Sequence, residues 1–142
     1  MNLIKRHKVS FIENSNLIAE RDFEICIGRI YENDIFHVYF FSGAFVDMDF
    51  IEKVYQFNRE NGNNKYLNLF EFEPNVDFAT EVREWASAPE GNKNTIADAL
   101  VISSLPHKIL ANFYLKFNKP VKPTKIFNSR DKAIPWLLKQ KV

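Results

Sequence analysis

The chain has 142 residues, of which 46% are hydrophobic and 14 are phenylalanine, a composition that excludes a disordered protein. This length suits one domain with a substantial core, and we expect residues 1–142 to form it. Cys26 is the only cysteine, which excludes a disulfide framework and a thiolate metal site and predicts an inert thiol within a strand. The formal net charge is +1, and we expect no nucleic-acid partner.

The small net charge hides an uneven distribution along the chain. Residues 1–94 hold ten Lys and Arg against sixteen Asp and Glu, a net charge of −6, whereas residues 95–142 hold nine against two, a net charge of +7. The simpler interpretation is that the two parts pack together and compensate each other, and the alternative is a basic patch for an anionic partner. No apolar run approaches the roughly 18 residues of a membrane span and no secretory signal opens the chain, so we expect a soluble cytoplasmic protein without a transmembrane segment.

The first part of the chain predicts strands. Weak strand patterns at Lys8–Glu13 and Leu17–Arg21 belong to an N-terminal extension, residues 1–22. Two stronger patterns, Glu24–Tyr31 and Ile35–Phe41, flank a three-residue turn and predict an antiparallel hairpin.

The middle of the chain alternates helices and strands. Asp47 is a good N-cap for a helix whose apolar stripe ends at Asn61 and Gly62. Tyr66–Phe72 predicts a central strand, and Asp77–Ala86 predicts a helix with apolar residues on one side. A loop rich in Pro, Gly and Asn then leads to the next strand.

The C-terminal part begins with a strand and a helix. Ala97–Ser103 is a short apolar run, typical of a strand buried on both faces. The helix that follows carries an apolar stripe at spacings of three and four, which we expect to face the core while lysines face water. The stripe consists of Leu110, Phe113, Tyr114 and Phe117.

A second strand and a final helix complete this part. Lys125–Asn128 is a short strand pattern, and Ser129 is a good N-cap for a helix whose Trp136 we expect to be buried against the sheet. Strands joined through a helix by short loops are usually parallel. The whole order therefore predicts an α/β fold with a mixed central sheet, an N-terminal antiparallel hairpin, and then alternating helices and parallel strands.

The C-terminal elements resemble those of a known group of proteins. The sequences ADALVISS (97–104), LANFYLKFNKP (110–120) and PTKIF (123–127), with an A-x-x-W-L helix (133–137), resemble the SpoIIAA-like or STAS-like small bacterial proteins of unknown function. The resemblance implies a SpoIIAA-like fold and says nothing about chemistry. Anti-sigma-factor antagonists of this fold carry a phosphorylatable serine in a turn after a strand. The corresponding turn here, residues 73–77, reads EPNVD and has no serine or threonine, so a phospho-switch is not implied.

The sequence contains no recognisable catalytic motif. His7, His37 and His107 lie far apart in sequence and do not predict a metal site, and we interpret His37, within a strand, as structural or exposed. Glu71 and Glu73 alternate with phenylalanines, which is typical of one polar face of a strand and less so of a general acid and base. We therefore expect a protein that is not an enzyme and that holds no metal or cofactor.

One junction stands out as a candidate binding site. In sheets with parallel strands, ligands collect where strands end and helix N-termini present free backbone N–H groups. The candidate residues are Ser103, Ser104, His107 and Lys108, with Ser129 at the next junction. Their side chains suit a phosphate or carboxylate, and the alternative is that Ser103 or Ser104 only caps the helix while His107 faces solvent. We expect Lys116–Lys125 at the opposite edge, as mobile charges that attract anions without shaping a site.

The function favoured by these observations is a non-enzymatic binding or regulatory module that acts through protein–protein interaction. The alternative is a carrier or binder of a small anionic or amphipathic, lipid-like ligand in an aromatic-lined pocket under the helices. A large apolar cavity would favour the carrier, whereas a filled core with an exposed apolar patch would favour a protein partner. The sequence leaves the ligand, the partner and the oligomeric state open, with a homodimer as one option.

Overall fold

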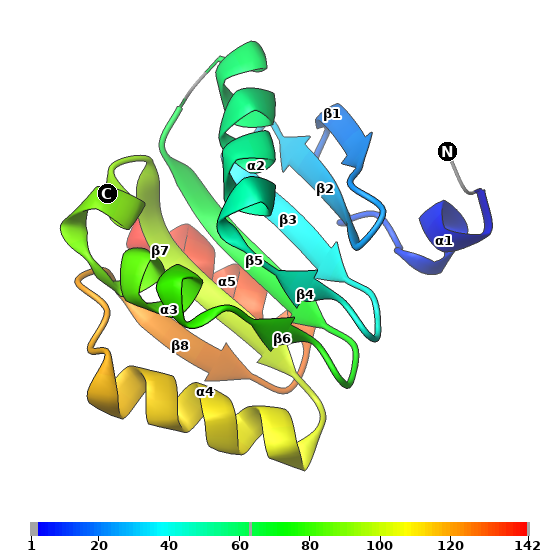
Figure 1. Cartoon of the computed structure of the whole chain (residues 1–142). Coiled ribbons are helices and arrows are strands. Elements are labelled where there is room, and N and C mark those ends of the chain that lie inside the picture. Colours follow the sequence, from blue (N-terminus) through cyan, green and yellow to red (C-terminus); the bar gives the residue numbers. More distant parts are fainter. Residues whose placement is uncertain (1–2, 63, 142) are drawn as a thin grey trace.

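A mixed sheet lies at the centre of the domain (Figure 1). The computed structural model describes residues 3–62 and 64–141, and the main sheet that they form has six strands. In spatial order these are β1 (Leu17–Asp22), β2 (Cys26–Tyr31), β3 (Ile35–Phe40), β5 (Tyr66–Phe72), β7 (Thr95–Ile102) and β8 (Thr124–Phe127). Neighbours among β1, β2 and β3 are antiparallel, whereas β3, β5, β7 and β8 run parallel. The predicted α/β fold, with antiparallel strands first and parallel strands afterwards, is confirmed.

Helices cover both faces of this sheet (Figure 1). They are α1 (Leu3–Lys8), α2 (Met48–Glu60), α3 (Thr80–Ser87), α4 (Leu105–Phe117) and α5 (Arg130–Gln140). Helix α5 lies on one face, and α2, α3 and α4 lie on the other. A small parallel sheet of β4 (Phe45–Val46) and β6 (Asp77–Phe78) lies beside these three helices, and a 3-10 helix, η1 (Pro89–Asn92), precedes β7.

The face under α5 has a closely packed core. Ala133 and Leu137 of α5 are fully buried against leucines of β5. Ala97 and Ala99 of β7 are fully buried in the same cluster, and their small side chains let α5 lie close to the sheet. This face therefore leaves little unfilled space.

The opposite face carries a phenylalanine-rich core. Phe40 of β3 stacks on Phe72 of β5 with ring centroids 5.1 Å apart. Phe50 and Phe57 of α2 pack edge-on against Phe23, at 5.6 and 5.7 Å. Such aromatic pairs stabilise beyond the area that they bury, so α2 is well anchored on this face.

The strand predicted at Lys8–Glu13 is wrong, whereas the one predicted at Leu17–Arg21 is confirmed as β1. Helix α1 ends at Lys8, and irregular chain and a turn follow. Val9 and Ile12 are buried, so this segment contributes side chains to the core without joining a strand ladder. Apolar residues in an irregular segment gave the appearance of a strand pattern.

The helix predicted from Asp77 begins three residues later, at Thr80. Asp77 and Phe78 form β6, because the N–H groups of Asp77 and Ala79 donate to the carbonyl oxygens of Ala44 and Val46, both at 2.9 Å. Pairing with a distant segment therefore overrides the local helical pattern at this point.

Helix α4 departs most from prediction. Leu110, Phe113 and Phe117, which we expected in the core, are 55–61% exposed. Within α4, all of which the structure describes, Ala111 is the one buried residue. The helix has apolar residues on nearly every side, so their spacing does not determine which side faces the sheet. Instead, α4 is rotated about its axis so that the imidazole of His107 contacts the backbone of Val76, between β5 and β6.

Trp136 is half-buried, and the prediction that it is the buried anchor of the last helix is wrong. Its ring packs against Phe127 of β8 with centroids 5.5 Å apart, near the edge of the sheet. The fully buried position belongs to the next residue, Leu137.

Replacing Leu137 with alanine should lower the free energy of unfolding by about 2 to 5 kcal/mol, because the change leaves a cavity in a packed core. The adjacent Leu138 is 42% exposed, and Leu138→Ala should lower it by about 1 kcal/mol or less. Urea denaturation of both variants measures the difference. Equal losses would show that α5 does not dock through Leu137.

Candidate functional site

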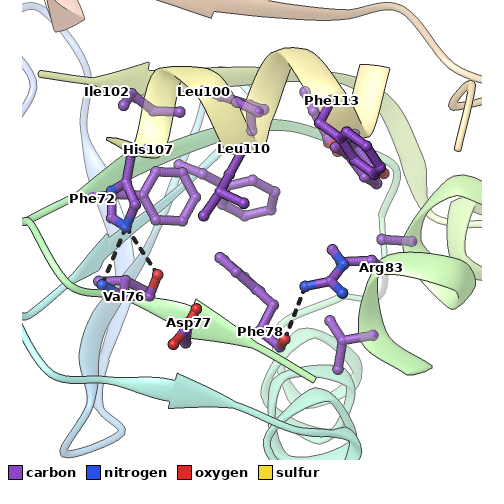
Figure 2. A pocket seen from close by; sticks show the side chains of 16 residues that line it. Phe72, Val76, Asp77, Phe78, Arg83, Leu100, Ile102, His107, Leu110 and Phe113 are labelled. Atoms are coloured by element: carbon purple, nitrogen blue, oxygen red, sulfur yellow. Dashed lines mark hydrogen bonds between the residues drawn. The ribbon is translucent and has the colours of Figure 1, made fainter. Parts of the chain in front are cut away.

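An apolar cavity lies between α4 and the sheet (Figure 2). Its volume is about 250 Å³. Phe70 and Phe72 of β5, with Leu100 and Ile102 of β7, line it from the side of the sheet. Residues of β6 and α3, among them Phe78, line it further. The cavity is therefore bordered by elements from β5 to α4.

The cavity exists because α4 presents a small side chain to the sheet. The methyl group of Ala111 cannot fill the space above the two phenylalanines of β5. Leu110 and Phe113 also line the cavity, yet more than half of each is exposed. They form its rim, and the cavity opens beside the exposed side of α4.

Asp98, which lines the cavity, belongs to a buried ion pair. Asp98 of β7 accepts from Asn68 Nδ2 at 2.9 Å and pairs with Lys122 Nζ at 3.0 Å. Burial raises the pKa of the Asp98 carboxyl, and the charge of Lys122 offsets part of that effect. Lys122 is 6% exposed and also donates to the carbonyl of Ala86 at 2.9 Å and to Asn92. It is therefore not one of the mobile charges that we expected in this loop.

Two basic side chains line opposite parts of the cavity (Figure 2). Figure 2 shows His107 reaching from α4 to Val76, where its Nε2 lies 2.9 Å from the carbonyl oxygen and 3.2 Å from the backbone nitrogen. In the tautomer that carries a proton on Nε2, this atom donates to the carbonyl oxygen of Val76. In the other tautomer, Nε2 accepts from the backbone N–H of Val76. Arg83 of α3 donates to the carbonyl of Phe78 at 3.2 Å and to Thr80 Oγ1 at 3.3 Å. A guanidinium has five N–H donors, so further donors remain for a ligand.

The structure brings one of the five predicted site residues, His107, into the cavity. Ser104 caps α4, its Oγ accepting from the N–H of His107 at 3.3 Å, as in the helix-cap interpretation. Ser103 is exposed, Lys108 is partly exposed, and neither lines the cavity. Ser129 begins α5, which lies on the opposite face, and its side chain makes no cap hydrogen bond. The expectation that His107 faces solvent is wrong.

Sequence reasoning missed the other polar residues of the cavity. Asp98 carried a usable signal, because it interrupts an otherwise apolar strand run. Arg83 carried none, since only packing of α3 against β6 brings it to the cavity.

A polar cluster lies buried on the α5 face. Glu71 of β5, expected on a solvent-facing polar side, is buried and accepts from His37 Nε2 at 3.2 Å. Arg130 of α5 donates to both of its oxygens, through Nε at 2.8 Å and Nη2 at 3.0 Å. Arg130 also donates to the carbonyl and hydroxyl oxygens of Ser10, at 2.8 and 2.9 Å, which fixes the N-terminal segment over the sheet.

The charges of this cluster follow from burial and pairing. Burial alone would raise the pKa of Glu71, but hydrogen bonds and charge from His37 and Arg130 outweigh it and lower the pKa to about 2. Burial lowers the pKa of His37, against the opposing effect of Glu71, so its imidazole is neutral at neutral pH. Glu71 and Arg130 are therefore the charged pair, and both lowered pKa values make the fold less stable as the pH falls.

The described residues contain neither a metal-binding cluster nor a membrane-spanning helix. Across residues 3–62 and 64–141, His, Cys, Asp and Glu do not form a group of three or more that could hold a metal ion. None of the helices in those ranges is long and apolar enough to cross a membrane.

Comparison with known proteins places the chain in a family. A family model described as a domain of unknown function, DUF7793, matches residues 29–141. The chain belongs to this family. The DUF7793 region begins in β2 and includes every residue that lines the cavity. No curated protein and no solved structure matches the chain.

Replacing Arg130 with methionine should lower the free energy of unfolding at about pH 7 by about 3 to 5 kcal/mol, because Glu71 then keeps a buried charge without its main partner. The loss should shrink toward about pH 4, since uncompensated burial raises the pKa of Glu71 in the variant and its protonated form is tolerated. Denaturation at both pH values measures this.

Lys132→Met, at an exposed position of the same helix, is the matched control and should change stability little. A loss in Arg130→Met that is equal at both pH values would contradict the assignment of the charge to Glu71.

Proposed function

We propose that this domain is a non-enzymatic binding module that takes a small, mainly apolar ligand in the cavity between α4 and the sheet. The observation that carries the proposal is an open apolar cavity with a few polar groups at defined places, the usual form of a small-molecule site. This corresponds to the ligand-binding alternative derived from the sequence.

The size of the cavity limits the ligand. A cavity of about 150 Å³ lined by apolar side chains is large enough for benzene. The cavity here, at about 250 Å³, therefore suits one or two aromatic rings or a short acyl chain. A long-chain lipid does not fit inside it.

Arg83 favours a ligand that is neutral near Asp98 and anionic near α3, and the acidic side chain of Asp77 also lines the cavity. Lys122 already compensates the charge of Asp98, so a ligand meets no free charge beside that residue. Near β6 and α3, Arg83 has N–H donors beyond its two bonds to the protein. A carboxylate attached to an apolar body would place its charge against Arg83 and its body among the phenylalanines.

The lining also supports binding without catalysis. The residues that border the cavity, all within the described chain, include no serine, threonine, cysteine or lysine to act as a nucleophile. The Nε2 atom of His107 is hydrogen-bonded to the backbone of Val76.

The turn 73–77, which we compared with the phosphoserine turn of STAS-like proteins, contributes a wall of the cavity through Val76 and Asp77.

Filling the cavity should abolish binding. We expect Ala111→Leu to remove binding of indole and benzoate probes, because the larger side chain occupies the space above the phenylalanines of β5. Asn112→Leu adds the same side chain at the neighbouring, exposed position and should bind as the wild type does. Amide chemical shifts in an NMR titration measure both. The proposal fails if neither probe shifts the lining residues, or if both variants bind equally.

Arg83 should select for the anionic probe. Arg83→Gln should weaken benzoate binding about tenfold or more, because a hydrogen bond to a charged group contributes about 1.5 to 3 kcal/mol. Indole binding should change little in the same variant. Equal weakening of both probes would indicate that Arg83 only supports the shape of the cavity.

A further inference from the structure

The outward side of α4 is an uncovered apolar surface. Its large side chains are 55–69% exposed, and we call them the outer face of α4: Leu105, Ile109, Leu110, Phe113 and Phe117. Phe113 and Phe117 lie against each other with ring centroids 4.2 Å apart. Val121, just beyond the helix, is 60% exposed and extends the face. A contiguous apolar surface of this kind indicates a site of association.

The charged residues of the chain segment that carries this face all have one sign. Residues 105–125 contain five lysines and no acidic residue. Of these, Lys122 is paired with Asp98. Among the described residues, no carboxylate forms an ion pair with Lys108, Lys116 or Lys119. The outer face is therefore an apolar stripe accompanied by unpaired positive charge.

We propose that the outer face of α4 docks on an anionic lipid membrane surface. Helices that lie in the membrane interface combine large apolar side chains on one side with lysines beside them. Their ammonium groups interact with anionic headgroups while the apolar side chains enter the acyl boundary. Both features coincide on α4.

Charge argues against a second copy of the chain as the occupant. A two-fold contact between outer faces would bring the lysines of one α4 near those of the other, which is unfavourable. An anionic bilayer removes that repulsion. A bilayer also adapts to the convex surface of a helix, whereas a protein partner needs a matching groove.

The place of the cavity is consistent with this docking. Leu110 and Phe113 belong both to the outer face and to the rim of the cavity. A docked α4 would therefore put the mouth of the cavity at the lipid surface. The docking proposal does not depend on the ligand, because it stands on the exposed face and the lysines alone.

The test is co-sedimentation of the full chain with vesicles of phosphatidylcholine mixed with phosphatidylserine, and with vesicles of phosphatidylcholine alone. We expect partitioning onto the anionic vesicles, much weaker partitioning onto the neutral ones, and loss of binding as salt is raised, because salt screens the attraction. Absence of binding to anionic vesicles at low salt overturns the proposal.

Paired variants distinguish membrane binding through the outer face from non-specific adsorption of the protein to vesicles. Phe113→Ser with Phe117→Ser should weaken partitioning about tenfold or more, whereas Phe45→Ser, at a 56% exposed phenylalanine of β4, should not. Lys116→Glu with Lys119→Glu should weaken it by at least about 25-fold, because each lost lysine accounts for roughly fivefold and each new glutamate is repelled by the anionic lipid. Lys132→Glu with Lys139→Glu makes the same change of net charge on α5 and should have a smaller effect. Equal effects of each pair and its control overturn the proposal.

Two other outcomes would assign a different occupant. If the wild type sediments as a dimer in solution and the Phe113 and Phe117 variant is a monomer, a second copy covers the face and the membrane proposal falls. If an acidic amphipathic helical peptide binds the face while anionic vesicles do not, the partner is a protein helix, and the proposal falls equally. Urea denaturation of each variant confirms that it is folded.

Discussion

Helix α4 is held to the domain at its two ends by polar contacts and only weakly along its length by apolar ones. At its start, His107 binds the backbone of Val76. Beyond its end, Lys122 reaches Asp98 and the carbonyl of Ala86. Between these contacts, Ala111 is the residue that α4 buries. This arrangement leaves a cavity beneath the helix and an apolar surface outside it, so both proposals arise from one constraint.

The uneven charge along the chain has two consequences in the fold. Part of the basic C-terminal region compensates the acidic part through pairs such as Arg130 with Glu71 and Lys141 with Asp34, at 2.8 and 2.5 Å. These pairs lie on the α5 side, where the core is filled. Among the described residues, no ion pair joins the lysines of α4 to a carboxylate, so the positive charge that remains gathers beside the open side of the domain.

The sequence predicted the elements better than their contacts. Tyr66–Phe72 became β5 with the predicted bounds, because turn residues and Pro74 delimit a clear strand pattern. Asp47 caps α2 as predicted, its Oδ1 accepting from the N–H of Phe50 at 3.0 Å. Short-range patterns of this kind determine local structure at both places, whereas Ser129, also predicted as an N-cap, makes no cap hydrogen bond.

The errors occurred where a distant segment makes the choice. The rotation of α4 depends on a contact between His107 and Val76, which are 31 residues apart. Asp98 on β7 and Arg83 on α3 both line the cavity. No regular spacing in the sequence predicts that these two residues lie on the same cavity. Ligands often bind where parallel strands end, and this general rule points to the junction that contains His107. The rule does not predict the cavity that His107 borders.

The way α4 is attached bears on how a ligand reaches the cavity. Local opening requires less free energy where fewer apolar contacts are buried, so α4 should open more readily than α5. The chain after α4 contains Pro120 and Pro123, and the bonds of Lys122 lie between them. Local unfolding of α4 up to that segment would leave the sheet intact. In hydrogen exchange, the amides of α4 would therefore exchange earlier than those of α5, and a bound ligand would slow them.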